Sequence, residues 1–133
     1  MKVMIDTNIF ISAALFPNGI SATALYKALV PPFQPVTCEY VIDELHRKFQ
    51  DKFSDRMMEL EAFLFYMLPV IKVVPTPSAI VESEQKIRDP KDRPILRAAL
   101  SAGADLFLTG DKDFLESSVE DPRIIDAASF LNL

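Results

Sequence analysis

Short, uniformly apolar runs alternate with longer segments of helical periodicity along the whole chain of 133 residues. A half-exposed strand alternates apolar with polar side chains, whereas a strand that is buried on both faces is apolar throughout. Lys2–Ile5 and Asp105–Thr109 predict such buried strands, and the runs Val36–Cys38, Val70–Val74 and Arg123–Ile125 predict three further strands. Because helices separate these runs, we predict an α/β fold in which helices cover both faces of a parallel sheet.

The segments between the runs carry helical spacing and helix-ending residues. Tyr40–Phe53 places an apolar residue at every fourth position, which is typical of a helix buried along one face. Pro90 follows Asp89 as the first residue of a helix that Gly103 ends. The predicted helices are Ile9–Phe16, Ala22–Val30, Tyr40–Phe53, Met57–Leu68, Ala79–Ile87, the segment from Asp89 to Gly103, and a terminal helix capped by Asp126.

The composition excludes several kinds of site. Cys38 is the only cysteine and His46 the only histidine, which argues against a disulfide, a cysteine-based zinc site and a Ser-His-Asp centre. The formal charge is −5, with 19 acidic and 14 basic residues, the opposite of what a sequence-independent nucleic-acid binder carries. The most apolar stretch is far shorter than the ~20 residues that a bilayer requires, and we find no export signal. We therefore expect one domain, residues 1–133, in the cytoplasm and not at a membrane.

Four acidic residues fall where an α/β sheet binds ligands, beyond the carboxyl ends of its strands. Asp6 and Asp111 each follow a predicted strand, while Glu44 and Asp92 lie near the starts of predicted helices. Asp92 precedes Ile95 by three residues, so it is in line with the buried face of its helix. No lysine or arginine shares that inward face, and an unpaired buried charge is costly. The pattern therefore indicates a divalent cation as the missing positive charge.

The chemistry of these groups narrows the cation and the reaction. Ligands that are all oxygen suit Mg²⁺ or Mn²⁺ rather than zinc. Such a cation activates water and stabilises charge on a phosphoryl group, so hydrolysis of a phosphodiester is the natural reaction.

Each acid also has a purely structural explanation. Asp6 and Asp111 can cap the helix or turn that follows them, and Asp92 can interact favourably with its helix dipole. Glu44 can form an ion pair with Lys48, one helical turn later. The metal interpretation depends on all these acids meeting at one edge of the sheet.

Basic residues near these acids are candidates for contacts with a phosphate backbone, although such runs are usually only a solvated face. They are Arg47, Lys48, Arg88, Lys91, Arg93 and Lys112. We interpret His46 as a surface residue of its helix rather than as a general base.

Taken in order, the motifs resemble those of the PIN domain family. They are Met4-Ile5-Asp6-Thr7-Asn8, Glu44-Leu45, Asp89-Pro90-Lys91-Asp92, and Leu108-Thr109-Gly110-Asp111-Lys112-Asp113-Phe114. Each motif is weak by itself, but the ordered set runs through essentially the whole chain. The resemblance is closest to prokaryotic PIN proteins that are described as toxins of toxin–antitoxin pairs.

This resemblance implies a three-layer α/β/α sandwich with a five-stranded parallel sheet, and a ribonuclease that depends on Mg²⁺ or Mn²⁺. It implies that Asp6, Glu44 and Asp92 are the first three acids of the site. The fourth is Asp111 or, as second choice, Asp113, which is also a candidate metal ligand. Thr7, Asn8 and Thr109 match positions that orient the acids. The resemblance further implies a homodimer and a cognate antitoxin protein.

Two alternative functions share part of this pattern. A phosphoacceptor or aspartate-nucleophile phosphatase domain would use Asp6, but a phosphatase of that class carries a second aspartate where Asn8 stands here. A binding module would use the acids only to recruit a metal or a basic partner. Formation of a phosphoenzyme would favour the first alternative, and failure to cleave any RNA would favour the second.

Overall fold

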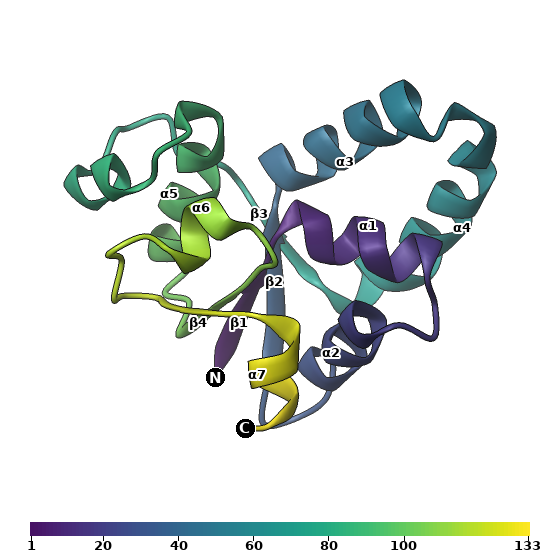
Figure 1. Ribbon diagram of the computed structural model, residues 1–133, viewed down its shortest axis with the longest axis horizontal. Coiled ribbons are helices and arrows are strands. Elements are labelled where there is room, and N and C mark those ends of the chain that lie inside the picture. The colour runs from purple at the N-terminus through teal and green to yellow at the C-terminus, as the bar shows by residue number, and fades with distance from the viewer.

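A computed structural model describes residues 1–133 and contains one five-stranded, fully parallel sheet. The strands lie in the order β3-β2-β1-β4-β5 (Figure 1). Their bounds are β1 Lys2–Ile5, β2 Gln34–Cys38, β3 Lys72–Val74, β4 Leu106–Leu108 and β5 Arg123–Ile125. The two central strands β1 and β4 are buried almost throughout, as their apolar sequences require.

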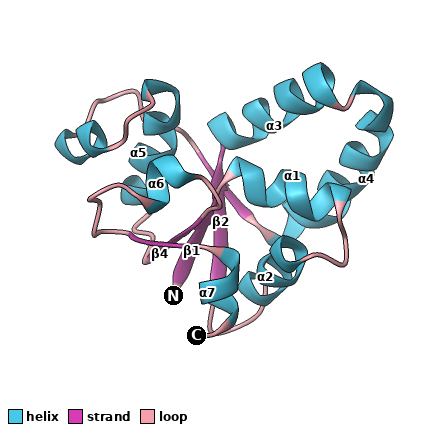
Figure 2. Cartoon of the chain, in the orientation of Figure 1, coloured by secondary structure: helices cyan, strands magenta, loops and turns pink.

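Helices cover both faces of this sheet. α1, α2, α3 and α4 lie on one side, α5 and α6 lie on the other, and α7 packs against α2 (Figures 1 and 2). The helices are α1 Thr7–Leu15, α2 Ile20–Ala28, α3 Glu39–Lys52, α4 Met57–Met67, α5 Arg93–Ser101, α6 Lys112–Leu115 and α7 Ala127–Leu131. This arrangement confirms the predicted three-layer α/β/α sandwich.

The core is a single cluster of apolar side chains between the sheet and its helices. On one face Phe107 of β4 stacks on Phe114 of α6, with ring centroids 4.5 Å apart. On the other face Phe10 of α1 meets Phe63 of α4 edge to face. Such aromatic pairs add to the free energy of burial and fix the positions of the helices that follow β1 and β4.

The strand order creates a switch point between β1 and β4. The chain leaves β1 toward β2 on one side, whereas β4 is reached by a crossover from the opposite edge, β3. The loops beyond β1 and β4 therefore diverge to opposite faces. We call the region between them, at the carboxyl ends of the strands where α/β proteins bind ligands, the crevice. Asp6 begins one loop and Thr109 begins the other.

Several predicted boundaries differ from the structure. Leu68–Val70 forms a 3₁₀ turn, so β3 starts only at Lys72 rather than at Val70. The predicted helix Ala79–Ile87 is wrong: only Glu82–Lys86 is helical, as a 3₁₀ segment. The ion pair between Glu84 and Arg97 of α5 ties this segment to the body of the protein, so tertiary contacts rather than local periodicity set its shape.

No single helix is long and apolar enough to cross a membrane. α1 and α2 pass that test of length and composition only as a pair, and they are bent by 117° relative to each other.

Candidate metal centre

Asp6 lies at the carboxyl end of β1 and is only 2% exposed. Its Oδ1 caps α1 by accepting the Thr7 N–H at 2.8 Å. Its Oδ2 accepts from Asn8 Nδ2 at 2.9 Å and from the Thr109 hydroxyl at 2.7 Å. Oδ1 thus keeps a free lone pair for a further ligand. Asp6 therefore caps α1 and also lies at the crevice, so both interpretations of this residue apply at the same time.

Glu44 approaches this site from α3, the helix that follows β2, and β2 is the strand next to β1. Its carboxylate is buried and accepts a hydrogen bond from the Thr7 hydroxyl. Lys48 Nζ lies 3.9 Å from the same Oε1, so the predicted helical ion pair is present as well. Through Thr7, which follows Asp6, the structure links Asp6 and Glu44.

Thr109 joins the two loops of the switch point. It is fully buried, and its hydroxyl oxygen accepts the Asp111 N–H at 2.9 Å while it donates to Asp6. Asn8 reinforces the link, because its Oδ1 accepts the Gly110 N–H at 2.7 Å. Thr7, Asn8 and Thr109 thus hold the acidic side chains at this edge of the sheet in fixed orientations.

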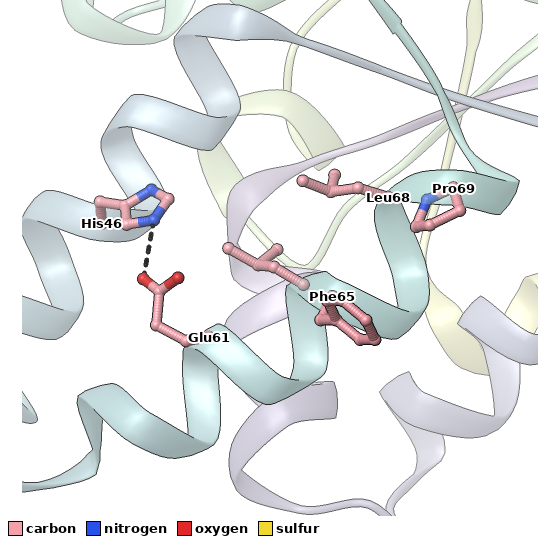
Figure 3. A pocket seen from close by; sticks show the side chains of 6 residues that line it. His46, Glu61, Phe65, Leu68 and Pro69 are labelled. Carbon is pink, nitrogen blue, oxygen red and sulfur yellow. Dashed lines mark ion pairs between the residues drawn. The ribbon is translucent and has the colours of Figure 1, made fainter.

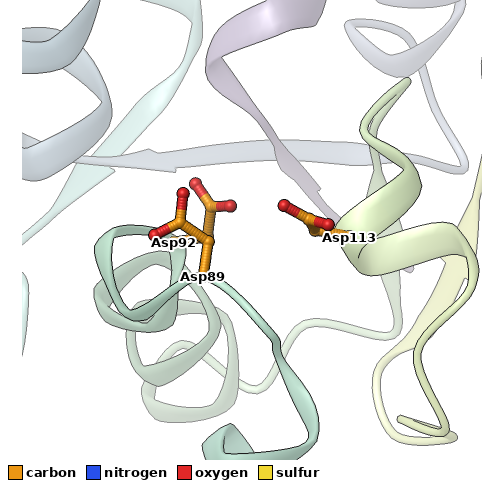
Figure 4. Close-up of side chains that lie close together, drawn as sticks. All are labelled: Asp89, Asp92 and Asp113. Carbon is orange, nitrogen blue, oxygen red and sulfur yellow. The ribbon is translucent and has the colours of Figure 1, made fainter.

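A compact group of three carboxylates comes from two segments, the turn before α5 and the start of α6. Asp89, Asp92 and Asp113 each offer an oxygen within 4.8 Å of the others (Figure 4). Asp113 lies on α6, which begins with Asp111 as cap: Asp111 Oδ1 accepts the Asp113 N–H at 2.9 Å. Asp111 therefore stands at the start of α6, whereas Asp113 lies beside the segment that carries Asp89 and Asp92.

Asp89 belongs to this group, although its sequence position indicated only that it precedes the helix that starts at Pro90. It does cap the 3₁₀ turn Pro90–Asp92, accepting the Lys91 N–H at 3.0 Å through Oδ1. The second oxygen of the Asp89 carboxylate can still bind a ligand. This capacity of a capping aspartate was the signal in the sequence that could have indicated Asp89 as a member of the cluster. Asp92 ends this 3₁₀ turn, is the N-cap of α5 and is partly buried.

Burial and mutual repulsion perturb the acids. Burial raises the pKa of Asp6 to about 6, against the lowering effect of its hydrogen bonds with Thr109 and Thr7. Burial also raises the pKa of Asp92 to about 7, and the charges of Asp111, Asp6, Asp89 and Glu44 add to this increase. Of the predicted acids, only Asp92 and Asp113 belong to the compact cluster. Asp6, Glu44 and Asp111 lie near enough to Asp92 for their charges to raise its pKa.

The predicted basic residues differ in their contacts and in their exposure. Arg88 forms an ion pair with Asp113, 2.9 Å from Nη2 to Oδ1. Arg93 donates from Nε to the Ile87 carbonyl at 3.0 Å, so it supports the loop before α5. The exposed members of the predicted set are Arg47, Arg88, Lys91 and Lys112, with Lys48 and Arg93 partly buried.

A pocket between α3 and α4 lies apart from these acids. Its lining is His46, Glu61, Leu64, Phe65, Leu68 and Pro69 (Figure 3). Both ring nitrogens of His46 have partners in these two helices: Nδ1 lies 2.9 Å from the Ile42 carbonyl, and Nε2 lies 3.3 Å from Glu61. This histidine joins two helices and faces none of the acids of the crevice.

The donor set fits a hard divalent cation. The clustered groups are the carboxylates of Asp89, Asp92 and Asp113, and the Asn8 amide and the Thr109 hydroxyl orient Asp6. Several negative charges meet where one carboxyl is already buried, so a cation with an affinity for oxygen relieves their repulsion. Neither histidine nor cysteine contributes a ligand atom to the cluster.

A comparison with protein families shows to which family the chain belongs. The family model described as PIN domain matches residues 2–113, which include every acid of the candidate centre. The chain belongs to the PIN domain family. The resemblance noted in the sequence is thereby confirmed.

Solved structures share the same PIN fold at low identity. VapBC2 from Rickettsia felis, bound to a DNA fragment from its promoter, has 15% identity and a TM-score of 0.69, over 95% of this chain and 98% of that chain. VapBC-1 from nontypeable Haemophilus influenzae has 20% identity and a TM-score of 0.66, over 96% and 99%. FitAB bound to an IR36 DNA fragment has 16% identity and a TM-score of 0.65, over 94% of each chain. No curated protein gives a significant match.

Proposed function

We propose that this PIN domain protein is a ribonuclease that hydrolyses RNA phosphodiester bonds with Mg²⁺ or Mn²⁺ as its cofactor. The observation that supports the proposal is the carboxylate cluster of Asp89, Asp92 and Asp113, together with the charges of Asp111, Asp6 and Glu44 that raise the pKa of Asp92. Asp6, Glu44, Asp92 and Asp111 would hold the cation, with Asp113 beside them. When bound, such a cation supplies an activated water and stabilises negative charge on the phosphate.

The residues of the chain have distinct roles in this proposal. Asn8 and Thr109 keep Asp6 in one orientation by donating to its Oδ2, so that the free lone pair of Oδ1 remains for the cation. Thr7 does the same for Glu44. Holding ligands in place before the substrate arrives removes the reorganisation that the reaction would otherwise require. No serine, cysteine or histidine nucleophile is needed, so water is the expected attacking group.

The phosphate backbone of RNA would lie along the basic residues at the rim. Arg47, Lys48, Arg88, Lys91, Arg93 and Lys112 are the proposed contacts, with Arg93 contributing less because its Nε already holds the Ile87 carbonyl. These side chains offset locally the overall charge of −5.

We further propose that the protein acts in the cytoplasm as the toxin of a toxin–antitoxin pair, as a homodimer that a cognate antitoxin restrains. The likeness to VapBC and FitAB supports a protein partner. Met58, Phe65 and Tyr66 of α4 are largely exposed, and apolar side chains of this size are typical of a surface that another protein covers.

Substitution of Asp6 tests the proposed reaction. We expect Asp6→Asn to abolish Mn²⁺-dependent cleavage of a mixed single-stranded RNA while the far-ultraviolet circular dichroism stays unchanged. Asp43→Asn, an exposed acid on α3, is the matched control and should keep full activity. RNA cleavage that survives Asp6→Asn refutes the assigned centre, and a phosphoenzyme formed from acetyl phosphate would favour the phosphatase alternative.

A further inference from the structure

Arg88 is an exposed arginine at the rim of the acidic crevice. Its side chain is 65% exposed, and its Nη2 lies 2.9 Å from Asp113 Oδ1 and 3.7 Å from Glu116 Oε1. Of the fourteen lysines and arginines, only Arg88 and Lys48 lie within 4 Å of a carboxylate of the proposed centre. Arg88 is the one that contacts the cluster of Asp89, Asp92 and Asp113.

The backbone that carries Arg88 is fixed, although the side chain is free to move. Ile87 is fully buried, and its carbonyl accepts from Arg93 Nε at 3.0 Å. The preceding 3₁₀ segment is held by Glu84, which pairs with Arg97. The guanidinium therefore remains within reach of the crevice, while its exposed contacts with Asp113 and Glu116 are easily exchanged.

The guanidinium and a divalent cation are attracted by the same oxygen atoms. Asp113 offers its oxygen within 4.8 Å of oxygens of Asp89 and Asp92, so a cation bound by this cluster would lie close to Arg88. Two positive groups at that separation repel each other, and both gain from the same carboxylate. Each therefore weakens the attraction of the other for Asp113.

We propose that Arg88 is a positioning residue with two alternative partners: Asp113, for which it competes with a divalent cation, and a phosphate group of the RNA strand. The second half rests on the proposed function. A guanidinium has five donors in a planar fork that matches a phosphate. Once a cation neutralises Asp113, Arg88 is released at the rim, where the acids would otherwise repel the RNA backbone. Arg88 thereby couples binding of the cation to binding of the substrate.

This dual role predicts changes of opposite sign on one substitution. Arg88→Gln should bind Mn²⁺ more tightly, by about three- to tenfold, because a competing charge at the rim has gone. The same variant should raise KM for a single-stranded RNA by about fivefold with kcat little changed, because a charged phosphate contact is lost. A residue that only stabilised the fold would weaken both.

Calorimetric titration with Mn²⁺ alone, on the folded chain of 133 residues, tests the competition without any RNA. Lys86→Gln is the matched control, since it removes the same charge two residues earlier from an exposed side chain without an ion pair. Arg88→Lys should give Mn²⁺ affinity near that of the wild type because it retains the charge. Thermal denaturation checks that all variants fold.

The outcomes separate this inference from the proposed function. Tighter Mn²⁺ binding by Arg88→Gln and not by Lys86→Gln, together with the raised KM, supports both halves of the inference. Tighter Mn²⁺ binding when even the wild type cleaves no RNA supports the competition and refutes the ribonuclease. Mn²⁺ affinity that is unchanged or reduced in Arg88→Gln overturns the inference, whether or not the protein cleaves RNA.

Discussion

Replacing Asp92 by asparagine should make the metal-free protein more stable at neutral and alkaline pH. The Asp92 carboxyl sits partly buried at the start of α5, among Asp111, Asp6, Asp89 and Glu44. No hydrogen bond contributes to its altered pKa, in contrast to Asp6. Asparagine has nearly the same shape and no charge, so the substitution removes repulsion without breaking a supporting contact.

The perturbed pKa sets the size and the pH range of this gain. Burial, followed by the neighbouring carboxylates, raises the pKa of Asp92 from 3.8 to about 7. The folded protein thus holds this proton more tightly than the unfolded chain, and the free energy of unfolding falls as the pH rises from about 4 to about 7. Without screening the loss would be about 4 kcal/mol. Because solvent reaches the carboxyl, we expect the substitution to recover about 1–2 kcal/mol at pH 8.

Urea denaturation in EDTA at pH 8 and at pH 4 measures this effect. Asp92→Asn should raise the free energy of unfolding at pH 8 and leave it nearly unchanged at pH 4. Asp43→Asn, the exposed control on α3, should change little at either pH. Adding Mn²⁺ should stabilise the wild type more than Asp92→Asn. A variant that is less stable than the wild type at pH 8 in EDTA would refute the reasoning, because it would show that the Asp92 charge does not oppose folding.

Two further substitutions test the supports of the centre. Thr109→Val keeps the shape of the buried side chain but removes the hydroxyl that donates to Asp6, so it should cost about 1–3 kcal/mol of stability. The substitution should also raise the pKa of Asp6, so that Mn²⁺ binding shifts to higher pH. An unchanged pH profile of Mn²⁺ binding in calorimetric titrations would contradict this. Glu84→Gln should cost about 2–4 kcal/mol in urea denaturation, because Arg97 loses its charged partner, and the double change to Glu84→Leu with Arg97→Met should recover part of that loss. Equal stabilities of the wild type and Glu84→Gln would show that the pair does not hold the 3₁₀ segment.

The strands were predictable because a parallel sheet buried on both faces leaves a direct mark on the sequence. β1 and β4 carry only apolar residues at their buried positions, and the acids that follow them could be placed at the carboxyl edge for that reason. The start of β3 was less predictable from the sequence. Leu68-Pro69-Val70 is as apolar as a strand, but in the structure it continues α4 as a 3₁₀ turn. Local hydrophobicity does not distinguish these two outcomes.

The candidate site was predictable as a set of acids and much less so as a geometry. Which carboxylates share one cluster depends on contacts between distant segments, such as Asp113 beside Asp89 and Asp92. The ion pair of Arg88 with Asp113 spans 25 positions and left no periodic signal in the sequence. Roles for Thr109 and Asn8 came only from the family resemblance, because a single hydroxyl or amide near a strand end has many ordinary uses.

A crystal of the protein grown with Mn²⁺ gives the most direct test, through the anomalous signal of the ion. The account predicts a peak in the crevice between β1 and β4, within about 2–2.5 Å of oxygens from Asp6 or Glu44 on one side and Asp92, Asp111 or Asp113 on the other. A fully occupied Mn²⁺ elsewhere on the molecule, with these carboxylates bound to no ion at saturating concentration, would contradict it.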